Sequence, residues 1–465
     1  MAISKTAIDK TELFETMPVP KAVGKLAVPT VLSSLVMVLY NLADTFFVGM
    51  LNDPLETGAV TLAATVLLAF NAVNNLFGVG CASLISRSLG VKDMDTAKKT
   101  GAFGFYGAII AGAVFSLLCT VAKSPLLTLL GASGEITGPT SDYLFWTVTL
   151  GAVPAILNVV ISQLVKAEGL ALHASIGTMS GCFLNMILDP IFILPWGLGM
   201  GAAGAGCATM ISNTVACLYF FVMMAAKRGK IVLDVHPKNF TVKKQIVKEV
   251  FGVGLPASVQ NLLNVTGMTV LNNFMAAYGP EAVSAIGIAH KMGMIPMYVS
   301  MGMSQGVMPL VGYNFASGNK RRMRDSVLYT AKLSVGFTGI SVALYLIFAR
   351  QIIGAFMQNP QVVEYGARFL LGQTLATLFL NIDFLGVGVF QACGMGKLSL
   401  LFAILRKIVL EIPALFVLNR LFPMYGLAYA GVVSEAVLST VAVLELRKII
   451  RIEPEAGSAA DRKNT

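Results

Sequence analysis

Two acidic residues stand inside apolar stretches of this sequence, and each has an amide side chain close to it. Asn41 and Asp44 lie three residues apart in a run that begins around Leu26, and Asn185 and Asp189 lie four apart in a later run. Spacings of three and four place both members of a pair on one face of a helix. A carboxylate at the centre of a lipid-facing helix costs about 2.5–3.5 kcal/mol on insertion scales, so these pairs predict an ion or substrate pathway.

The chemistry available to these groups is cation binding or proton transfer. Pro190 follows Asp189 and leaves the carbonyl of Met186 without its helical donor. Thr209 and Asn213 form another pair on one helical face. Carboxylates, amides, a hydroxyl and a free carbonyl are hard oxygen ligands that suit Na⁺. The same carboxylates could instead carry a proton.

Simpler readings exist for both acids. Asp44 could cap a helix that breaks near Gly49 and so reach outside water, and Asp189–Pro190 could mark an ordinary helix end, although residues 191–194 continue apolar. Two such sites in one half of the chain favour a shared functional cause over coincidence.

The elements that must position these residues are transmembrane helices. The chain has 465 residues and is 56% hydrophobic and 12% charged, whereas soluble domains carry about 25% charged residues. A bilayer span needs about 20 apolar residues, and period-2 alternation, the mark of membrane strands, is absent. We therefore expect an all-α membrane protein with twelve spans, near residues 26–48, 59–84, 103–122, 143–165, 173–194, 202–225, 250–277, 284–312, 327–349, 367–392, 400–422 and 427–446.

The basic residues predict the orientation of these spans. Lys and Arg cluster at 5–25, 87–99, 227–248, 320–332, 397–407 and 447–463, whereas the opposite loops hold only Lys123, Arg350, Arg368 and Arg420. The positive-inside rule places the basic loops and both termini in the cytoplasm, so we expect a multi-pass protein of the plasma (inner) membrane. The net charge of +10 then reflects sidedness, and nucleic acid is not an expected partner.

The chain also repeats itself at an offset of about 225 residues. "GKLAVPTVLSSL" at 24–35 resembles "FGVGLPASVQNLL" at 251–263, with Pro29 opposite Pro256, and "GCASLISRSLGVKD" at 80–93 resembles "GVMPLVGYNFASGN" at 306–319. Six spans per half predict two bundles related by a pseudo-two-fold axis along the membrane normal, with a cleft between them, as in a rocking transporter. We expect Pro29 and Pro190 to act as hinges.

The repeat predicts five segments. They are an N-terminal cytoplasmic segment (1–25), an N-terminal six-helix bundle (26–226), a linker (227–249), a C-terminal six-helix bundle (250–446) and a cytoplasmic tail (447–465).

The second half keeps its charges at different positions from the first. The repeat places Leu271 opposite Asp44, Glu411 opposite Asp189, Asp383 opposite Asn158 and Glu435 opposite Asn213. Asp383 is either a second proton or substrate-cation site or a structural partner of Lys291 or His290. Glu411 is expected to pair with Arg406 and Lys407, and Lys291 to snorkel or to pair with a carboxylate. The role of Glu435 stays open.

In this order and spacing the sequence resembles the multidrug and toxic compound extrusion (MATE) family. The resemblance rests on "LAVPTVLSSLVMVLYNLADTFFVG", "SLISRSLGVKDMDTAKK", "NMILDPIFI" and "GMGAAGAGCATMIS" in the first half, and on "AIGIAHKMGM" and "GYNFASGN" in the second. It covers about residues 20–450. Acids in the first and fifth spans resemble the prokaryotic DinF-like branch.

The resemblance implies a cation-coupled antiporter that exports amphipathic, often cationic, compounds in exchange for Na⁺ or H⁺. It maps the cation site onto Asp44, Asn185, Asp189 and Thr209, with Asn158 nearby, and we count Tyr40, Asn41 and Asn213 as supporting polar groups. Some family members use acids in the seventh and tenth spans. This chain has Gln260 in the seventh, and Asp383 lies close to the tenth-span position.

The leading hypothesis is therefore antiport, in which cation binding at Asp44 and Asp189 moves the first helix and expels substrate from the cleft, both events drawing on one set of polar groups. A lipid-linked precursor flippase of the same superfamily is the alternative. An intramembrane aspartyl protease, which needs two acids about 3 Å apart, is disfavoured because its GxGD context is absent. No GxxxxGK[ST] loop occurs, so ATP is not expected as the energy source. We expect no cofactor, small amphipathic substrates, the lipid bilayer as surroundings, and a monomer.

Overall fold

The computed structural model describes residues 12–451, and every regular element in that range is a helix. The first half contains η1 (Glu12–Thr16), α2 (Val19–Gly49), α3 (Pro54–Asn74), η2 (Asn75–Val79), α4 (Gly80–Gly90), α5 (Met94–Val121), α6 (Lys123–Leu129), η3 (Gly134–Ile136), α7 (Thr137–Leu144), η4 (Phe145–Leu150), α8 (Ala152–Ala167), α9 (Ala171–Ile193) and α10 (Gly201–Ala226). The second half contains η5 (Pro237–Asn239), α11 (Lys244–Ala276), α12 (Pro280–Ala316), α13 (Lys320–Phe356), α14 (Pro360–Ala392), α15 (Gly396–Ile404), η6 (Leu405–Glu411), α16 (Ile412–Leu421) and α17 (Tyr425–Ile449).

All twelve predicted spans correspond to helices in this order. Nine are single long helices, and the other three, α3–η2–α4, α7–η4–α8 and α15–η6–α16, each contain a π-helical turn. At Gly151, directly after η4, the helix axis bends by 50°. Such π-helical turns are frequent at functional sites because they redirect side chains and loosen the backbone ladder.

By length and hydropathy alone, eight helices of the described chain could cross a membrane, or nine if the bent pair α7–η4–α8 counts as one span. The remaining three spans are α11, α12 and α15–η6–α16. They fall short because they carry amides, hydroxyls and charges, and these polar groups line a cavity (below) rather than facing lipid. Polar side chains inside a membrane are expected to face such an interior.

Several helices start with a short polar side chain that accepts a hydrogen bond from one of the free backbone N–H groups of the first turn. Asp93 accepts from Thr96 N at 3.0 Å at the start of α5, and Asn319 accepts from Arg322 N at 3.0 Å at the start of α13. Hydrogen bonding from Thr96 lowers the pKa of the Asp93 carboxyl below its ordinary value. Asp93 and Asn319 occupy equivalent positions of the two halves, so the repeat extends to the caps.

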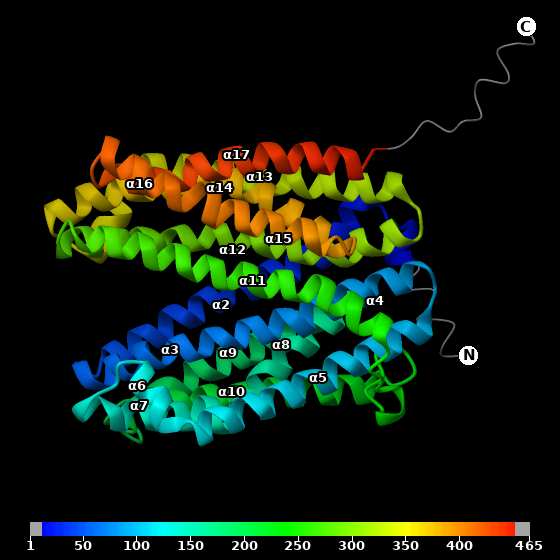
Figure 1. Ribbon diagram of the computed structural model, residues 1–465, viewed down its shortest axis with the longest axis horizontal. Coiled ribbons are helices and arrows are strands. Elements are labelled where there is room, and N and C mark those ends of the chain that lie inside the picture. The colour runs from blue at the N-terminus through cyan, green and yellow to red at the C-terminus, as the bar shows by residue number, and fades with distance from the viewer. Residues whose placement is uncertain (1–11, 452–465) are drawn as a thin grey trace, which may run out of the picture.

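The helices form two groups, which we call the N-lobe (α2–α10) and the C-lobe (α11–α17). The lobes lie together at the end of the molecule that holds both termini and separate toward the end that holds α6, α7 and α16 (Figure 1). The hydrophobic core follows this shape. One cluster runs through the N-lobe and continues into the C-lobe helices near the termini, whereas a second cluster is confined to the far ends of α11–α14, α16 and α17.

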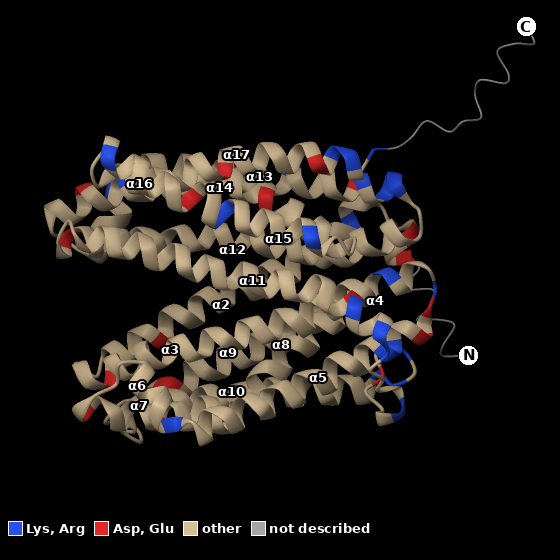
Figure 2. Cartoon of the chain, viewed as in Figure 1, with Lys and Arg blue, Asp and Glu red and all other residues tan. Residues whose placement is uncertain are grey.

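Most basic side chains gather at the end where the lobes meet (Figure 2). We call this the basic end. Glycines allow the lobes to approach closely there: a Cβ on Gly306 of α12 would lie 2.7 Å from the Cα of Ala27, and one on Gly80 of α4 would lie 2.4 Å from the carbonyl oxygen of Val250. An ion pair of 3.0 Å between Arg87 and Glu249 also joins the lobes.

The segment before α2 adds to this closure. Phe14 is buried and stacks on the Tyr313 ring of α12 at 4.8 Å, and Arg322 of α13 donates to the Phe14 carbonyl at 2.6 Å. An N-terminal segment thus packs against the C-lobe at the basic end.

Candidate functional site

The centre of the N-lobe cluster is Asp189, which is completely buried on α9. Pro190 lies inside this helix, which continues to Ile193, so Asp189 is not at a helix end. In the orientation that satisfies both ends of its amide, Asn185 donates to Asp189 Oδ2 at 2.8 Å and accepts from the Thr209 backbone N–H at 3.1 Å. Asn185 therefore links α9 to the start of α10.

Asp44 approaches this group from α2, where it is half-buried, and it interacts electrostatically with Asp189. The structure thus brings together the two acids that are 145 positions apart in the sequence. Tyr40, one turn earlier on α2, and the buried Tyr143 of α7 interact with both carboxylates. Tyr143 was not among the predicted residues, since a single tyrosine in a predicted span carries no distinguishing signal.

A chain of amides extends the cluster. Asn158 Nδ2 of α8 donates to Asn213 Oδ1 at 3.2 Å, and Asn213 Nδ2 donates to the Thr209 carbonyl at 3.0 Å. The Oδ1 atom of Asn158 is buried without a hydrogen-bond partner. Asn41 lies apart from the cluster, because its side chain is exposed and its amide donates to the Met37 carbonyl of its own helix.

The charges of this cluster are uncompensated. Neither Asp44 nor Asp189 makes an ion pair with any residue between 12 and 451. Two carboxylates, the Thr209 hydroxyl and the unpartnered Asn158 oxygen are suitable ligands for Na⁺. In the described chain, no three His, Cys, Asp or Glu side chains are grouped to hold a metal ion, so a transition-metal site is not indicated.

The C-lobe acids are arranged differently. Asp383 of α14 pairs with Arg406 of η6, and not with Lys291 or His290, the partners considered from the sequence. Glu435 of α17 pairs with the same guanidinium, with 2.8 Å between its Oε1 and Arg406 Nε. Glu411 was expected to pair with Arg406 and Lys407. Its Oε2 lies 2.6 Å from Lys407 Nζ, which confirms the second partner, whereas Arg406 pairs with Asp383 and Glu435 instead.

Arg406 and Lys407 do not lie in a cytoplasmic loop, although the sequence predicts a cytoplasmic basic cluster at 397–407. Helix α15 begins at Gly396, so both residues lie inside the span. The positive-inside rule applies to basic groups that stay in water. Here acidic partners on α14, α17 and η6 neutralise the two basic side chains, so these side chains can lie within the bilayer.

The remaining C-lobe candidates have separate locations. Lys291 is exposed on α12, in agreement with a snorkelling lysine. Gln260 of α11 accepts from Gln391 Nε2 of α14 at 3.4 Å, and it lines a cavity together with His290.

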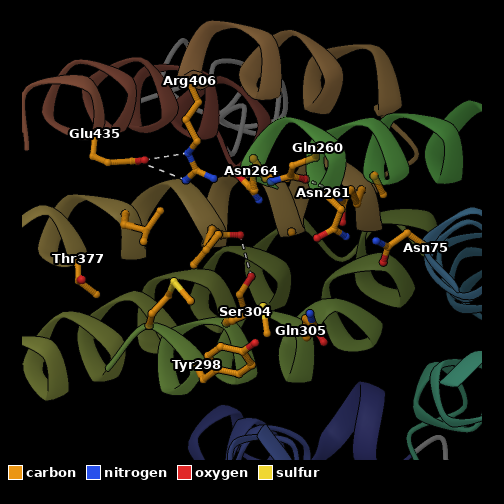
Figure 3. A pocket seen from close by; sticks show the side chains of 18 of the residues that line it. Asn75, Gln260, Asn261, Asn264, Tyr298, Ser304, Gln305, Thr377, Arg406 and Glu435 are labelled. Atoms are coloured by element: carbon orange, nitrogen blue, oxygen red, sulfur yellow. Dashed lines mark hydrogen bonds and ion pairs between the residues drawn. The ribbon is translucent and has the colours of Figure 1, made fainter. Parts of the chain in front are cut away.

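This cavity, of about 510 Å³, lies between the lobes. Its N-lobe wall includes Asn75 and Gln163, and its C-lobe wall is formed mainly by α11, α12, α14 and η6. The side chains labelled in Figure 3 are largely neutral hydrogen-bonding groups, with Arg406 and Glu435 at one wall. Methionines 294, 297, 301 and 308 also line it, and flexible thioethers adapt to ligands of varied shape.

Neither Asp44 nor Asp189 lines the cavity. The N-lobe acids and the polar groups that line this cavity are therefore different side chains in this arrangement, and the hypothesis of one shared set of polar groups gains no support from it.

The MatE family model matches residues 29–191 and 256–417, one match in each half of the chain. The chain is 35% identical over 435 residues to the "Multidrug export protein MepA" of Staphylococcus aureus (strain MRSA252), covering 93% of this chain and 94% of that protein. Its structure is similar to "Outward-facing conformation of a multidrug resistance MATE family transporter of the MOP superfamily", with a TM-score of 0.89, 25% identity and coverage of 98% and 99%. It is also similar to "Crystal structure of MATE in the bent conformation", with a TM-score of 0.86, 25% identity and coverage of 98% of both chains.

Proposed function

Because the chain belongs to the MatE family of membrane transporters, we propose that it exports amphipathic, often cationic, compounds and draws the energy from inward movement of Na⁺ or H⁺. The observation that carries the coupling is the pair of acids in the N-lobe, Asp44 and Asp189, which interact with each other and have no basic partner in the described chain. A carboxylate pair inside a membrane needs a positive charge, and a passing cation supplies it.

Helix α2 connects this pair to the lobe interface. Its far half carries Asp44, and its basic-end half packs against α12, where Gly302 approaches Val31 and Gly306 approaches Ala27. Pro29 lies between these two contacts and removes a backbone hydrogen bond. A cation that binds Asp44 and Asp189 draws α2 toward α9, and a bend near Pro29 transmits this shift to the interface.

In this mechanism the substrate does not compete with the cation for the same side chains. The substrate occupies the cavity between the lobes, and the cation occupies the N-lobe cluster. The two are coupled because each changes the balance between arrangements open to opposite sides, by its different affinity for the two. Rocking of two bundles, 26–226 and 250–446 around the linker 227–249, provides the movement.

The orientation proposed from the basic loops places the basic end in the cytoplasm of a cell and the open end outside it, in the plasma membrane. The arrangement in Figure 1 is then the one that releases substrate outward. We propose a monomer that uses no cofactor and no ATP and performs no catalysis.

A flippase for lipid-linked pyrophosphates is a second candidate, because Arg406 and Lys407 do reach the cavity wall. Both cations are neutralised by acids, however, so the wall offers little net positive charge to a pyrophosphate. The same observation favours export of cations.

Reconstituted vesicles test the coupling, with ethidium efflux measured while the Na⁺ and pH gradients are imposed one at a time. Asp44→Asn and Asp189→Asn should each abolish the response to the gradient that drives the wild type. The control is Glu364→Gln, which removes an acid that already pairs with Arg368 and does not line the cavity, and this variant should keep gradient-driven efflux. Full gradient dependence in both Asp variants would exclude this site.

A further inference from the structure

The cavity wall contains an ion cluster with unequal charges. Arg406, Asp383 and Glu435 have exposed side-chain fractions of 3%, 1% and 6%, so all three are buried. The guanidinium donates through Nη2 to both Asp383 and Glu435, its Nε lies 2.8 Å from Glu435 Oε1, and its Cζ atom lies 5.1 Å from the Phe384 ring centroid. One cation therefore serves two carboxylates.

A second polar signal shows that this cluster is incomplete. Asp383 Oδ1 is buried and has no hydrogen-bond partner. The neighbouring Lys407–Glu411 pair is balanced one to one, so it has no cation to spare. When both acids are ionised, the cluster holds two negative charges and one positive charge, and an uncompensated buried charge is strongly destabilising.

The geometry shows which acid an entering group can reach. Arg406 and Glu435 line the inter-lobe cavity (Figure 3), and Asp383 is not among the residues that line it. A positive group in the cavity therefore meets Glu435 rather than Asp383. Amides such as Asn264 and the α12 methionines surround the same space and accommodate the remainder of an amphipathic molecule.

We propose that Glu435 binds the positively charged nitrogen of the transported compound, an organic cation of the ammonium or iminium class. On binding, Glu435 pairs with the substrate and Arg406 remains with Asp383, which leaves two balanced pairs in place of one cation shared by two acids. This assignment rests on the proposed export of cationic compounds, and it adds the residue that selects for charge.

Ligand binding to the purified full-length protein tests this, with ethidium as the cationic probe and Nile red as a neutral probe of similar size. Glu435→Gln leaves Arg406 and Asp383 balanced, so it should fold, and thermal unfolding checks this. We expect the Kd for ethidium to rise at least about tenfold and the Kd for Nile red to stay within about twofold. The control Glu364→Gln removes a C-lobe acid that is paired with Arg368 and does not line the cavity, so it should leave the ethidium Kd within about twofold.

Unchanged ethidium binding by Glu435→Gln would overturn the assignment, as would an equal loss for both probes or an equal loss in the control. Binding and transport separate the two proposals. If ethidium binding depends on Glu435 but no ion gradient drives efflux, the coupling proposal fails and this one stands. If efflux is gradient-driven but binding ignores Glu435, this one fails alone.

Discussion

The two lobes carry polar residues at equivalent positions, but they give their acidic side chains different partners. In the N-lobe, the Asn185 amide donates to Asp189 one turn later. At the same offset in the C-lobe, Lys407 makes an ion pair with Glu411 one turn later. An amide orients a carboxylate but leaves its negative charge in place, whereas an ammonium group neutralises that charge.

The second pair of equivalent positions shows the same contrast. Asn158 and Asn213 hydrogen-bond directly in the N-lobe, and their counterparts Asp383 and Glu435 are held by Arg406 in the C-lobe. The C-lobe thus supplies two cations, Arg406 and Lys407, for its three acids, whereas the N-lobe supplies none for Asp44 and Asp189. A duplicated fold needs uncompensated acids in only one copy to bind a passing ion, and the other copy is free to hold substrate.

The largest effect is expected from removing the C-lobe's internal cation. The alignment that places Glu411 opposite Asp189 also places Arg406 opposite Leu184. Arg406→Leu therefore gives this C-lobe position the residue that the N-lobe has. It leaves two buried acids unpaired and should destabilise the protein by about 3–5 kcal/mol, the usual cost of breaking a buried pair. Thermal unfolding in detergent measures the loss.

The matched variant adds Asp383→Asn and Glu435→Asn to Arg406→Leu, which gives the C-lobe the residues of the N-lobe. Replacing a whole buried ion cluster is often neutral in stability, so most of the loss should be recovered. If the triple variant is no more stable than Arg406→Leu alone, the charges do not account for the effect, and lost packing against Phe384 does.

The next effect comes from building a C-lobe pair into the N-lobe. Gly267 is the counterpart of Tyr40, and a Cβ there would lie 2.9 Å from Lys407 Cδ, so the glycine makes room for the lysine. Tyr40→Gly with Asn185→Lys should place an ammonium beside Asp189. We expect a folded protein whose gradient-driven ethidium efflux falls at least about tenfold, because a tethered cation occupies the site.

Tyr40→Gly alone is the control for that experiment. It removes the ring without adding a charge, so it should retain more gradient-driven efflux than the double variant. Equal efflux in the two variants would mean that neutralising the charge of Asp189 does not account for the functional difference between the two lobes.

The sequence predicts the architecture and the N-lobe acids well, because both depend on local signals. Apolar length predicts all twelve spans, and a carboxylate in such a span is conspicuous wherever it occurs. The C-lobe cluster depends on long-range contacts. Arg406 follows a stretch of basic residues and looks cytoplasmic until α14 and α17 bring Asp383 and Glu435 to it. Tyr143 reaches the N-lobe acids through the tertiary packing of α7, and the distance between those acids and the cavity depends on how the helices and lobes pack.

A smaller effect is expected at Tyr143. Tyr143 interacts with both Asp44 and Asp189, whereas the acids of the C-lobe interact with the basic side chains of Arg406 and Lys407. Tyr143→Phe removes the hydroxyl that interacts electrostatically with both carboxylates and keeps the ring, so the half-saturating ion concentration for efflux should rise about three- to tenfold, in line with one lost polar interaction of about 1 kcal/mol. An unchanged ion dependence would show that the two acids alone form the site.

The smallest effect is expected at Gly267. A new Cβ there meets the Lys407 side chain at 2.9 Å, whereas a Cβ on Gly306 meets the backbone of Ala27 at 2.7 Å. A flexible lysine can move aside and the Ala27 backbone cannot, so Gly267→Ala should change stability by less than about 1 kcal/mol, within the helix propensity difference itself. Gly306→Ala should destabilise the closed basic end by about 1–3 kcal/mol, as overpacking does. Thermal unfolding of both variants compares them. A larger loss for Gly267→Ala would mean that Lys407 is held rigidly on Glu411, and the C-lobe would then owe its balance to a fixed geometry rather than to charge alone.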